Sequence, residues 1–335
     1  MSINKGFQQT LCIAVKREHG EKTRKILVEL GLLNRAFKVI RSSDYIHFPV
    51  VNSGEVERLL AENSIDYVIT ECIVEESHLV RAINVPSHDY VDGVVILREQ
   101  VLERRDLIEL IKLFEGIYKK LKAIYLKKGV SGESRASELV LLWGSEVSTV
   151  MHKEYGLRFI VDIHRVYFNP RLSTEHRLLV KEVSDGELVV DAFSGFGGFS
   201  IHIASLRKCR VLANDVNPHA LACLVKNIEL NKRLLKGSIV AVNGDSSQMT
   251  SFLRKSIADR IIADIPHRSI EFMEVYNHLA RKGTVLHLYL VSKDLSEALR
   301  SSSKLIEEGW HLINARRVLE YSPMKNVFRV DFRKL

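Results

Sequence analysis

Three glycines and an acid gather in one short stretch of the chain, Asp191-Ala-Phe-Ser-Gly-Phe-Gly-Gly-Phe199. An apolar run predicted to be a strand leads into the stretch, and a predicted helix follows it. A glycine-rich turn between a strand and a helix lets a ligand approach the backbone closely. Gly195, Gly197 and Gly198 are too crowded for the Gly-x-Gly-x-x-Gly spacing of dinucleotide sites. The stretch therefore indicates a ligand site of another kind, although glycine-rich turns also serve packing.

Further acids follow the next predicted strands. Asp215 comes after the second strand, where a carboxylate can accept hydrogen bonds from both ribose hydroxyls of an adenosine. Asp245 comes after the third strand, within reach of an adenine edge, and Asp264-Ile-Pro266 ends the fourth. A strand-end aspartate is often only a helix cap. Four polar strand ends at the edge where open α/β sheets bind their ligands argue against coincidence.

The elements that would position these acids begin near Pro170. Predicted strands and helices alternate from there on, with strands at 188–192, 210–213, 238–242, 260–263 and 285–290 and helices at 199–205 and 218–231. Short apolar strands separated by helices imply a parallel sheet covered on both faces. We therefore predict an α/β, Rossmann-like, mostly parallel domain over residues 166–335.

Two smaller α+β regions are predicted before it. The first, residues 1–65, contains a strand at 11–15, a helix at 20–30 and strands at 37–40 and 45–51, and a polar connection runs on through Ser77. The second, residues 66–165, contains a strand at 91–97, a long amphipathic helix at 103–126 and strands at 139–143 and 157–163. The sequence thus predicts three domains.

Composition and charge limit the class of protein. The apolar fraction is 46% and the charged fraction 27%, which is ordinary for a globular chain of 335 residues. Lysine and arginine exceed aspartate and glutamate by 8, and the pI is near 9.2. A basic balance suits a polyanion such as RNA or DNA, although many basic proteins never bind one.

Other patterns argue for what the chain lacks. Cys12, Cys72, Cys209 and Cys223 form no Cys-x-x-Cys pair and the thirteen histidines show no His-Glu-x-x-His spacing, so we expect neither disulfides nor a metal. No apolar run reaches the ~20 residues of a membrane span, and no signal peptide is recognisable. We expect a cytoplasmic protein with no membrane association, and no protein partner is implied.

The strand-end series resembles that of the class I S-adenosylmethionine-dependent methyltransferases. The resemblance implies S-adenosylmethionine as cofactor, held by residues of the strand-end turns: Asp191, Phe193, Ser194, Gly195, Gly197, Asp215, Val216, Asp245, Ser246, Asp264 and Pro266. Sulfonium chemistry needs no metal and no covalent intermediate. The protein has to align donor and acceptor for a direct displacement, which is a matter of positioning and electrostatics.

A second run carries a more specific resemblance. Residues 151–176 include Asn169-Pro-Arg-Leu-Ser-Thr-Glu-His176, and Asn217-Pro-His-Ala and Asn227-Ile-Glu-Leu-Asn231 follow. Together with the glycine-rich turn, these elements are similar to the archaeal and eukaryotic tRNA (guanine-37-N1)-methyltransferase family over nearly the whole chain. In that family an N-terminal module docks on the tRNA elbow, a middle domain follows, and the catalytic domain comes last. The resemblance therefore implies tRNA as the partner.

The same resemblance assigns catalytic roles. Guanine N1 carries a proton at neutral pH, so its methylation needs a general base and stabilisation of charge on O6. The family's base falls on Glu175 and its O6-stabilising arginine on Arg135, and Asp264 takes the third catalytic position. Residues expected to shape the substrate pocket are Tyr167, Asn169, Arg171 and His267. Without the resemblance, Glu175 would be read as a helix N-terminal carboxylate and Arg135 as a surface cation.

One departure from the family bears on the target atom. The family commonly has Asn-Leu-Pro where this chain has Asp264-Ile-Pro266. An amide both donates and accepts hydrogen bonds, whereas an ionised carboxylate only accepts them, so contact with a guanine edge would change. The Asp-Ile-Pro sequence also has a faint likeness to the Asp-Pro-Pro-aromatic motif of exocyclic-amine methyltransferases.

Several alternatives stay open. A sister family of the same fold transfers the aminocarboxypropyl group of S-adenosylmethionine to a tricyclic guanine derivative at position 37, but it generally lacks the Arg-Leu-x-x-Glu arrangement. A bifunctional methyltransferase acting also on that tricyclic base is another reading. A non-catalytic RNA-binding protein and a small-molecule methyltransferase are less consistent with the intact acid series and with the long basic N-terminal region.

Overall fold

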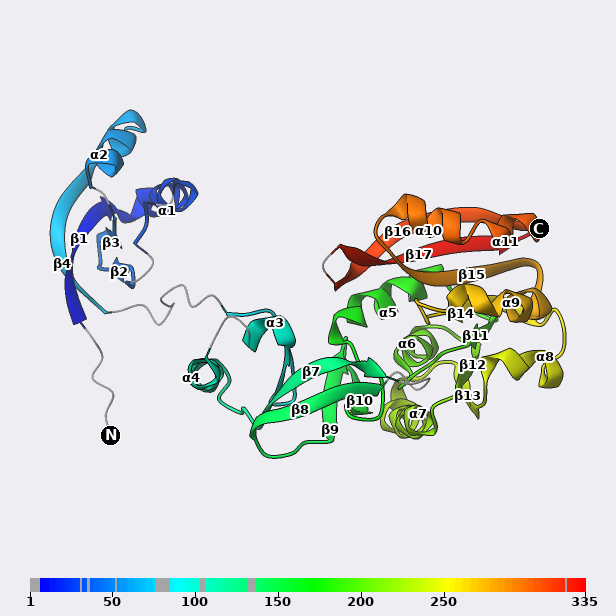
Figure 1. Ribbon diagram of the computed structural model, residues 1–335. Coiled ribbons are helices and arrows are strands. Elements are labelled where there is room, and N and C mark those ends of the chain that lie inside the picture. The colour runs from blue at the N-terminus through cyan, green and yellow to red at the C-terminus, as the bar shows by residue number, and fades with distance from the viewer. Residues whose placement is uncertain are drawn as a thin grey trace. The chain divides into compact units, whose positions relative to one another are not determined.

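The computed structural model describes residues 7–30, 32–34, 37–51, 53–75, 85–102, 106–131, 136–322 and 324–335. The chain divides into two compact units, residues 1–85 and 86–335 (Figure 1). Each unit has its own hydrophobic core, so each is described by itself.

The first unit is an antiparallel sheet with two helices. Its strand order is β2-β3-β1-β4. The elements are β1 (Phe7–Lys16), α1 (Gly20–Glu29), β2 (Ile40–Arg41), β3 (Tyr45–Pro49), α2 (Ser53–Glu62) and β4 (Tyr67–Glu75). Leu27 of α1 and Val56 and Leu60 of α2 are buried with Ile13 and Phe48 of the sheet.

Strand β4 corrects the domain boundary predicted at residue 65. It pairs with β1 over nine residues, from Tyr67 to Glu75, so it completes the sheet of the first unit. The sequence predicted a polar connection here because Thr70 and Glu71 interrupt the apolar residues, so no regular alternation marks the strand. Cys72 and Val74 are buried on one face, while Ile69 and Ile73 on the other face are exposed.

The second unit begins with a four-stranded sheet in the order β5-β6-β7-β8. Its elements are β5 (His88–Val91), β6 (Val94–Arg98), α3 (Glu99–Leu102), α4 (Leu107–Ile117), β7 (Ala123–Ser131) and β8 (Ala136–Gly144). The predicted helix over 103–126 is wrong in its second half, because α4 ends at Ile117 and β7 follows. All four residues 123–126 are buried, and an apolar run of that length does not distinguish a strand from a helix by periodicity.

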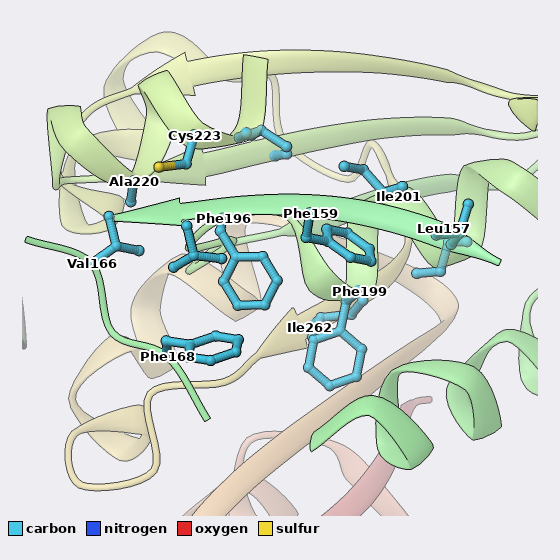
Figure 2. Packing of buried hydrophobic residues seen from close by; sticks show 14 of the residues in the cluster. Leu157, Phe159, Val166, Phe168, Phe196, Phe199, Ile201, Ala220, Cys223 and Ile262 are labelled. Atoms are coloured by element: carbon cyan, nitrogen blue, oxygen red, sulfur yellow. The ribbon is translucent and has the colours of Figure 1, made fainter. Parts of the chain in front are cut away.

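A hairpin links this sheet to the largest one. Strands β9 (Thr149–Glu154) and β10 (Leu157–Asp162) pair through a turn at Tyr155 and Gly156, both with positive φ. Phe159 of β10 packs edge-on against Phe196, which in turn contacts Phe168 (Figure 2). The hairpin therefore shares the core of the domain that follows.

Two asparagines of helix α7 (Pro218–Asn231) hold the edge of that hairpin. The Asn227 side chain accepts a hydrogen bond from the Ile160 amide at 2.6 Å and donates one to the Ile160 carbonyl at 3.0 Å. Asn231 does the same with Arg158, at 3.0 Å and 2.6 Å. Four residues of a helix rise about 6 Å, and two residues of a strand about 6.6 Å. The Asn-x-x-x-Asn spacing therefore lets a helix satisfy alternate residues of a strand.

The largest sheet has the order β13-β12-β11-β14-β15-β17-β16. Neighbours from β13 to β15 are parallel, whereas β17 runs antiparallel to β15 and β16. The strands are β11 (Leu188–Asp191), β12 (Arg210–Asp215), β13 (Ser238–Asn243), β14 (Ala258–Ala263), β15 (Ala280–Ser292), β16 (Trp310–Ser322) and β17 (Lys325–Lys334). The helices besides α7 are α5 (Ser173–Leu179), α6 (Gly198–Leu206), α8 (Met249–Phe252), α9 (Met273–Leu279), α10 (Leu295–Ser301) and α11 (Lys304–Glu307).

Both faces of this sheet are buried, as the sequence predicted. Val189 of β11 packs in one cluster with residues of α6 and α7, while its neighbour Val190 packs in another with residues of α9. Ile262 and Ile261 of β14 divide in the same way. Successive strand residues face opposite sides, so strands that are apolar throughout need helices on both. The α/β, Rossmann-like prediction for this part of the chain is confirmed.

We predict that Asn227→Ala destabilises the second unit, because it leaves the partly buried amide and carbonyl of Ile160 without partners. The expected loss is about 2–4 kcal/mol in the free energy of unfolding, measured by urea denaturation. Lys226→Ala, an exposed position of the same helix, serves as the control and should change it by no more than about 0.5 kcal/mol. Equal stabilities of the two variants would contradict the role given to the asparagine.

Candidate active site

A pocket opens at the carboxyl ends of the parallel strands. Residues of the strand-end turns and of the helix starts that follow them form most of its wall, and residues from the segment before α5 and from α5 itself add the rest. The lining residues are Val166, Tyr167, Asn169, Leu172, His176, Phe193, Ser194, Gly195, Phe196, Gly198, Phe199, Asp215, Val216, Asn217, Ala220, Asp245, Ser246, Asp264, Ile265, Arg268 and Phe272.

The glycine-rich turn bends tightly against Asp215. Gly195 and Gly197 have φ angles of +54° and +95°, a region that side chains with a Cβ rarely adopt. Asp215 Oδ2 accepts a hydrogen bond from the Gly195 amide at 2.8 Å, and its Oδ1 accepts one from Asn217 at 2.9 Å. Gly197 does not line the pocket; a Cβ there would lie 2.4 Å from Leu224, so this glycine serves packing.

Asp215 is the carboxylate best placed for a ligand. Burial raises its pKa, and the two backbone hydrogen bonds oppose that shift. Each oxygen accepts one backbone hydrogen bond and retains acceptor capacity toward the pocket. These properties suit a ligand that presents vicinal hydroxyls.

The turn after β13 contributes a neutral and a charged residue to the pocket wall. Ser246 is buried, donates to the Ala192 carbonyl at 2.6 Å and accepts from Asn214 at 3.0 Å. Asp245 is exposed and accepts from the Ser247 amide at 2.9 Å as a helix cap. Asp245 lines the pocket, so capping its turn and facing a ligand are compatible.

Asp191 lies behind the pocket rather than in its wall. It is fully buried, and the Ser200 hydroxyl donates to its Oδ2 at 2.6 Å, while Oδ1 has no hydrogen-bond partner among the described residues. Burial raises the pKa of Asp191 to about 7, and the nearby carboxylates of Asp264 and Asp215 add to the shift. A direct cofactor contact for Asp191 stays a prediction.

Glu175 lies in the first turn of α5 and is only 3% exposed. Its Oε1 accepts hydrogen bonds from the Tyr289 hydroxyl at 2.7 Å and from Arg329 Nη1 at 3.2 Å. Its Oε2 accepts one from Arg316. The three donors lie on β15, β17 and β16, far from Glu175 in sequence, so no local pattern could relate them to it.

Arg329 and Tyr289, two of the three groups that bind Glu175, are buried with it. Burial lowers the pKa of Arg329, but Tyr289 and the carboxylates of Asp331, Glu175 and Glu182 outweigh it and raise that pKa. Burial, followed by the charge of Glu175, raises the pKa of Tyr289 well above its ordinary value. The guanidinium therefore stays charged and the phenol protonated at physiological pH.

Glu175 does not line the pocket, but its surroundings do. Leu172 and His176, on either side of it in the chain, are part of the wall. The Tyr289 ring that binds it lies 5.5 Å, centre to centre, from Phe199, another wall residue. Of its three donors, Arg316 has a side chain that is 31% exposed, so the carboxylate is one side chain away from solvent.

The other predicted site residues divide into three groups. Phe193, Ser194, Val216, Asp264, Tyr167 and Asn169 line the pocket. Pro266, His267 and Arg171 do not: His267 packs edge-on against Tyr321, and Arg171 turns to Asp89 of β5 with an ion pair of 3.0 Å. Arg135 lies outside the described residues.

Several wall residues escaped the sequence reasoning. Phe196, Phe199 and Ala220 are apolar positions that read as core, and Asn217 reads as a helix cap, a role it also has, since it accepts from the His219 amide at 3.0 Å. Arg268 follows the predicted Asp264-Ile-Pro266 element by two residues. The signal that could have found it is its place in the same strand-end turn.

Comparison with known proteins agrees with this geometry. A model of the TRM5/TYW2 methyltransferase domain matches residues 150–311, and one of the tRNA methyltransferase 5 N-terminal domain matches residues 12–57. The tRNA (guanine(37)-N(1))-methyltransferase Trm5b of Methanocaldococcus jannaschii is 30% identical over 96% of this chain and 98% of its own. The chain belongs to the Trm5 family. Its resemblance to that family, predicted from sequence, is confirmed.

Two further relatives bear on the choice within the fold. A solved complex of aTrm5 and tRNALeu matches with a TM-score of 0.64 and 30% identity, over 97% of this chain and all of that one. The tRNA(Phe) (4-demethylwyosine(37)-C(7)) aminocarboxypropyltransferase of Pyrococcus horikoshii is also 30% identical, but over only 61% of this chain and 73% of its own. The Trm5 likeness thus includes the N-terminal part of the chain.

The pocket fits the cofactor of this family, S-adenosylmethionine. Asp215 offers acceptors for ribose hydroxyls, the backbone of Gly195 in the pocket wall allows close approach, and Phe193 and Phe272 supply apolar surface. In the part of the chain that the structure describes, no helix is long and apolar enough to span a membrane.

We predict that Asp215→Asn weakens S-adenosylmethionine binding by about tenfold or more, measured by isothermal titration calorimetry. The amide nitrogen would face a backbone N–H that now donates to a carboxylate oxygen, so the turn and the ribose contact are both disturbed. Asp66→Asn, an exposed position of the first unit, is the control. An unchanged dissociation constant for Asp215→Asn would contradict this assignment.

The raised pKa of Asp191 predicts a pH-dependent stability. Between 3.8, the ordinary value, and about 7, the folded chain holds a proton that the unfolded chain has lost. The free energy of unfolding contributed by this group therefore falls as pH rises through that window. Asp191→Asn lacks this loss. The free energy of unfolding of Asp191→Asn minus that of the parent chain should therefore be larger at about pH 8 than at about pH 5, measured by urea unfolding. A stability difference that is the same at both values would contradict the shift.

Proposed function

We propose that this chain transfers the methyl group of S-adenosylmethionine to N1 of guanine 37 in the anticodon loop of tRNA. The single observation that carries the proposal is that the likeness to a tRNA (guanine(37)-N(1))-methyltransferase extends over nearly the whole of both chains, including the N-terminal part. The aminocarboxypropyltransferase likeness covers a smaller share of the chain. The excess of 8 positive charges is consistent with a polyanionic substrate.

The cofactor contributes an electrophilic methyl group, so the protein has to align the acceptor and remove its proton. Residues that would hold the cofactor are those of the strand-end turns, with Asp215 at the ribose. Asp264, at the end of β14, lines the same pocket and would face the incoming base. A base within a tRNA loop has to leave its stack to reach such a pocket.

Glu175 is the proposed general base. In the structure its carboxylate is engaged by Tyr289, Arg316 and Arg329, and a base has to come within hydrogen-bond reach of the proton that it accepts. Arg316 is the donor that can move, because it is partly exposed while Arg329 is 1% exposed. We therefore propose that the target guanine replaces the Arg316 guanidinium at Oε2 of Glu175.

The remaining parts of the chain have roles in substrate binding under this proposal. The first unit docks on the body of the tRNA, and the sheet β5–β8 carries Arg135, the residue proposed to stabilise charge on O6, in the segment between β7 and β8. The ion pair of Arg171 with Asp89 links the turn before α5 to β5. It therefore fixes α5, and with it the general base Glu175, relative to that sheet. A cytoplasmic location follows from the substrate and belongs to the proposal.

The reaction is tested with paired tRNA transcripts carrying G37 or A37, labelled S-adenosylmethionine and nucleoside mass spectrometry. We expect 1-methylguanosine from the G37 transcript and none from A37. A mass gain of an aminocarboxypropyl group, or methylation at another atom, would overturn the proposal. A G37 transcript already converted to the tricyclic base serves to detect the second, bifunctional activity.

We predict that Glu175→Gln lowers the single-turnover rate of methyl transfer by about a hundredfold or more, because general-base catalysis contributes about that much. Binding of tRNA and S-adenosylmethionine should change little. Glu229→Gln, an exposed glutamate of α7, is the control. A rate within a few-fold of the parent chain would show that another group removes the proton.

A further inference from the structure

Three histidines surround a buried glutamate beside the pocket, and the proposed reaction uses none of them as acid or base. His152 and Glu154 alternate on β9 and so share one face of the hairpin. His176 lies on α5 and His202 on α6. Four imidazole or carboxylate groups from three elements thus converge in the interior of the second unit.

The distances between these groups are short. Glu154 Oε2 lies 2.8 Å from His176 Nδ1 and 2.8 Å from His202 Nε2. The ligand-type atoms of Glu154, His176 and His202 all lie within 4.8 Å of one another. His152 Nε2 lies 3.1 Å from the other carboxylate oxygen, Oε1.

Hydrogen bonding alone accounts for only part of the cluster. Although His152 Nε2 and Glu154 Oε1 are 3.1 Å apart, their orientation makes no hydrogen bond, and both atoms are buried without a partner among the described residues. His202 Nδ1 is likewise buried without one. Buried polar atoms without partners are rare in native proteins, so the hydrogen bonds within the cluster leave part of its polar groups unsatisfied.

The charge of the cluster points the same way. The Glu154 side chain is fully buried, and in the described part of the chain no lysine or arginine forms an ion pair with it. A second group, Glu182, His287 and Asp331, provides a contrast. There Arg329 pairs with Asp331 at 3.0 Å and Arg260 lies 2.6 Å from His287 Nε2, so cations of the protein already occupy that site.

We propose that Glu154, His176 and His202 bind a divalent transition metal ion such as Zn²⁺. Two imidazoles and one carboxylate form a ligand set that zinc prefers. Bonds of about 2.0–2.2 Å place tetrahedral ligand atoms about 3.3 Å apart, so each imidazole nitrogen, now 2.8 Å from the carboxylate oxygen, has to move away from it by about 0.5 Å to admit the ion. His176 Nδ1 and His202 Nε2 both donate to the same carboxylate oxygen, so on metal binding each imidazole releases that proton or carries it on its other ring nitrogen, since a bound imidazole must present its lone pair.

The position of the site gives it a structural role. His176 lines the cofactor pocket, and a Cβ on Gly198 would lie 2.4 Å from the His176 ring. An ion on His176 would therefore fix a ring against the glycine-rich turn and tie α5, α6 and the β9–β10 hairpin together. The sequence pattern predicted no metal because these ligands come from three elements without a motif spacing. The proposal does not depend on which base the enzyme methylates.

The test uses the full chain without a polyhistidine tag, stripped with a chelator and then exchanged against Zn²⁺ or Co²⁺. We expect about one zinc per chain by plasma mass spectrometry and a higher thermal midpoint, since a ligand that binds only the folded state stabilises it. Co²⁺ should give the visible absorption of a tetrahedral site. His202→Gln should lose the bound ion, and His311→Ala, an exposed histidine of β16, should retain it.

Retention of zinc by His202→Gln at the parent level, or no stoichiometric uptake by the parent chain, would overturn the proposal. If His202→Gln does not fold, zinc X-ray absorption on the parent chain decides. Two imidazoles and carboxylate oxygen in the coordination shell support the site, and thiolate or all-oxygen ligands contradict it.

Discussion

A carboxylate buried among two guanidiniums and a phenol connects helix α5 to the last three strands of the large sheet. Glu175 comes from the first turn of α5, and its partners Tyr289, Arg316 and Arg329 come from β15, β16 and β17. An uncompensated charge in such surroundings costs several kcal/mol, so the strands and α5 hold each other in register. The same contacts place Leu172 and His176 in the pocket wall. A group suited to catalysis is thus also a structural tie.

The pocket itself depends on the direction of the strands. Parallel strands end at one edge, which brings the turns of Asp215, Asp245 and Asp264 together without any further device. What parallel strands do not provide is a wall on the open side of that edge. The β9–β10 hairpin supports that wall, held by Asn227 and Asn231 of α7, and Phe159 packs against Phe196 of the glycine-rich turn.

Those features of the site that follow from a local pattern of residues could be predicted from the sequence. The strand ends at Asp215, Asp245 and Asp264 could be predicted because polar residues interrupt apolar runs there, and all three line the pocket. The partners of Glu175 could not, since Arg316 and Arg329 approach it only through the antiparallel pairing of β16 and β17. Strand β4 was missed because polar residues interrupt its apolar pattern, and β7 because a short run buried on both faces is equally compatible with a helix. Local pattern is therefore least informative where the apolar residues follow neither the period of a strand nor that of a helix.

The role of Glu175 as general base is tested most directly by a structure of the full chain with a G37 tRNA and a non-reactive analogue of S-adenosylmethionine. We expect guanine 37 to be unstacked, with N1 within about 3 Å of a Glu175 oxygen. We also expect that Arg316 no longer occupies Oε2, while Tyr289 and Arg329 stay in place. A guanine bound in the pocket with Glu175 still covered by Arg316, and another group at N1, would contradict that role.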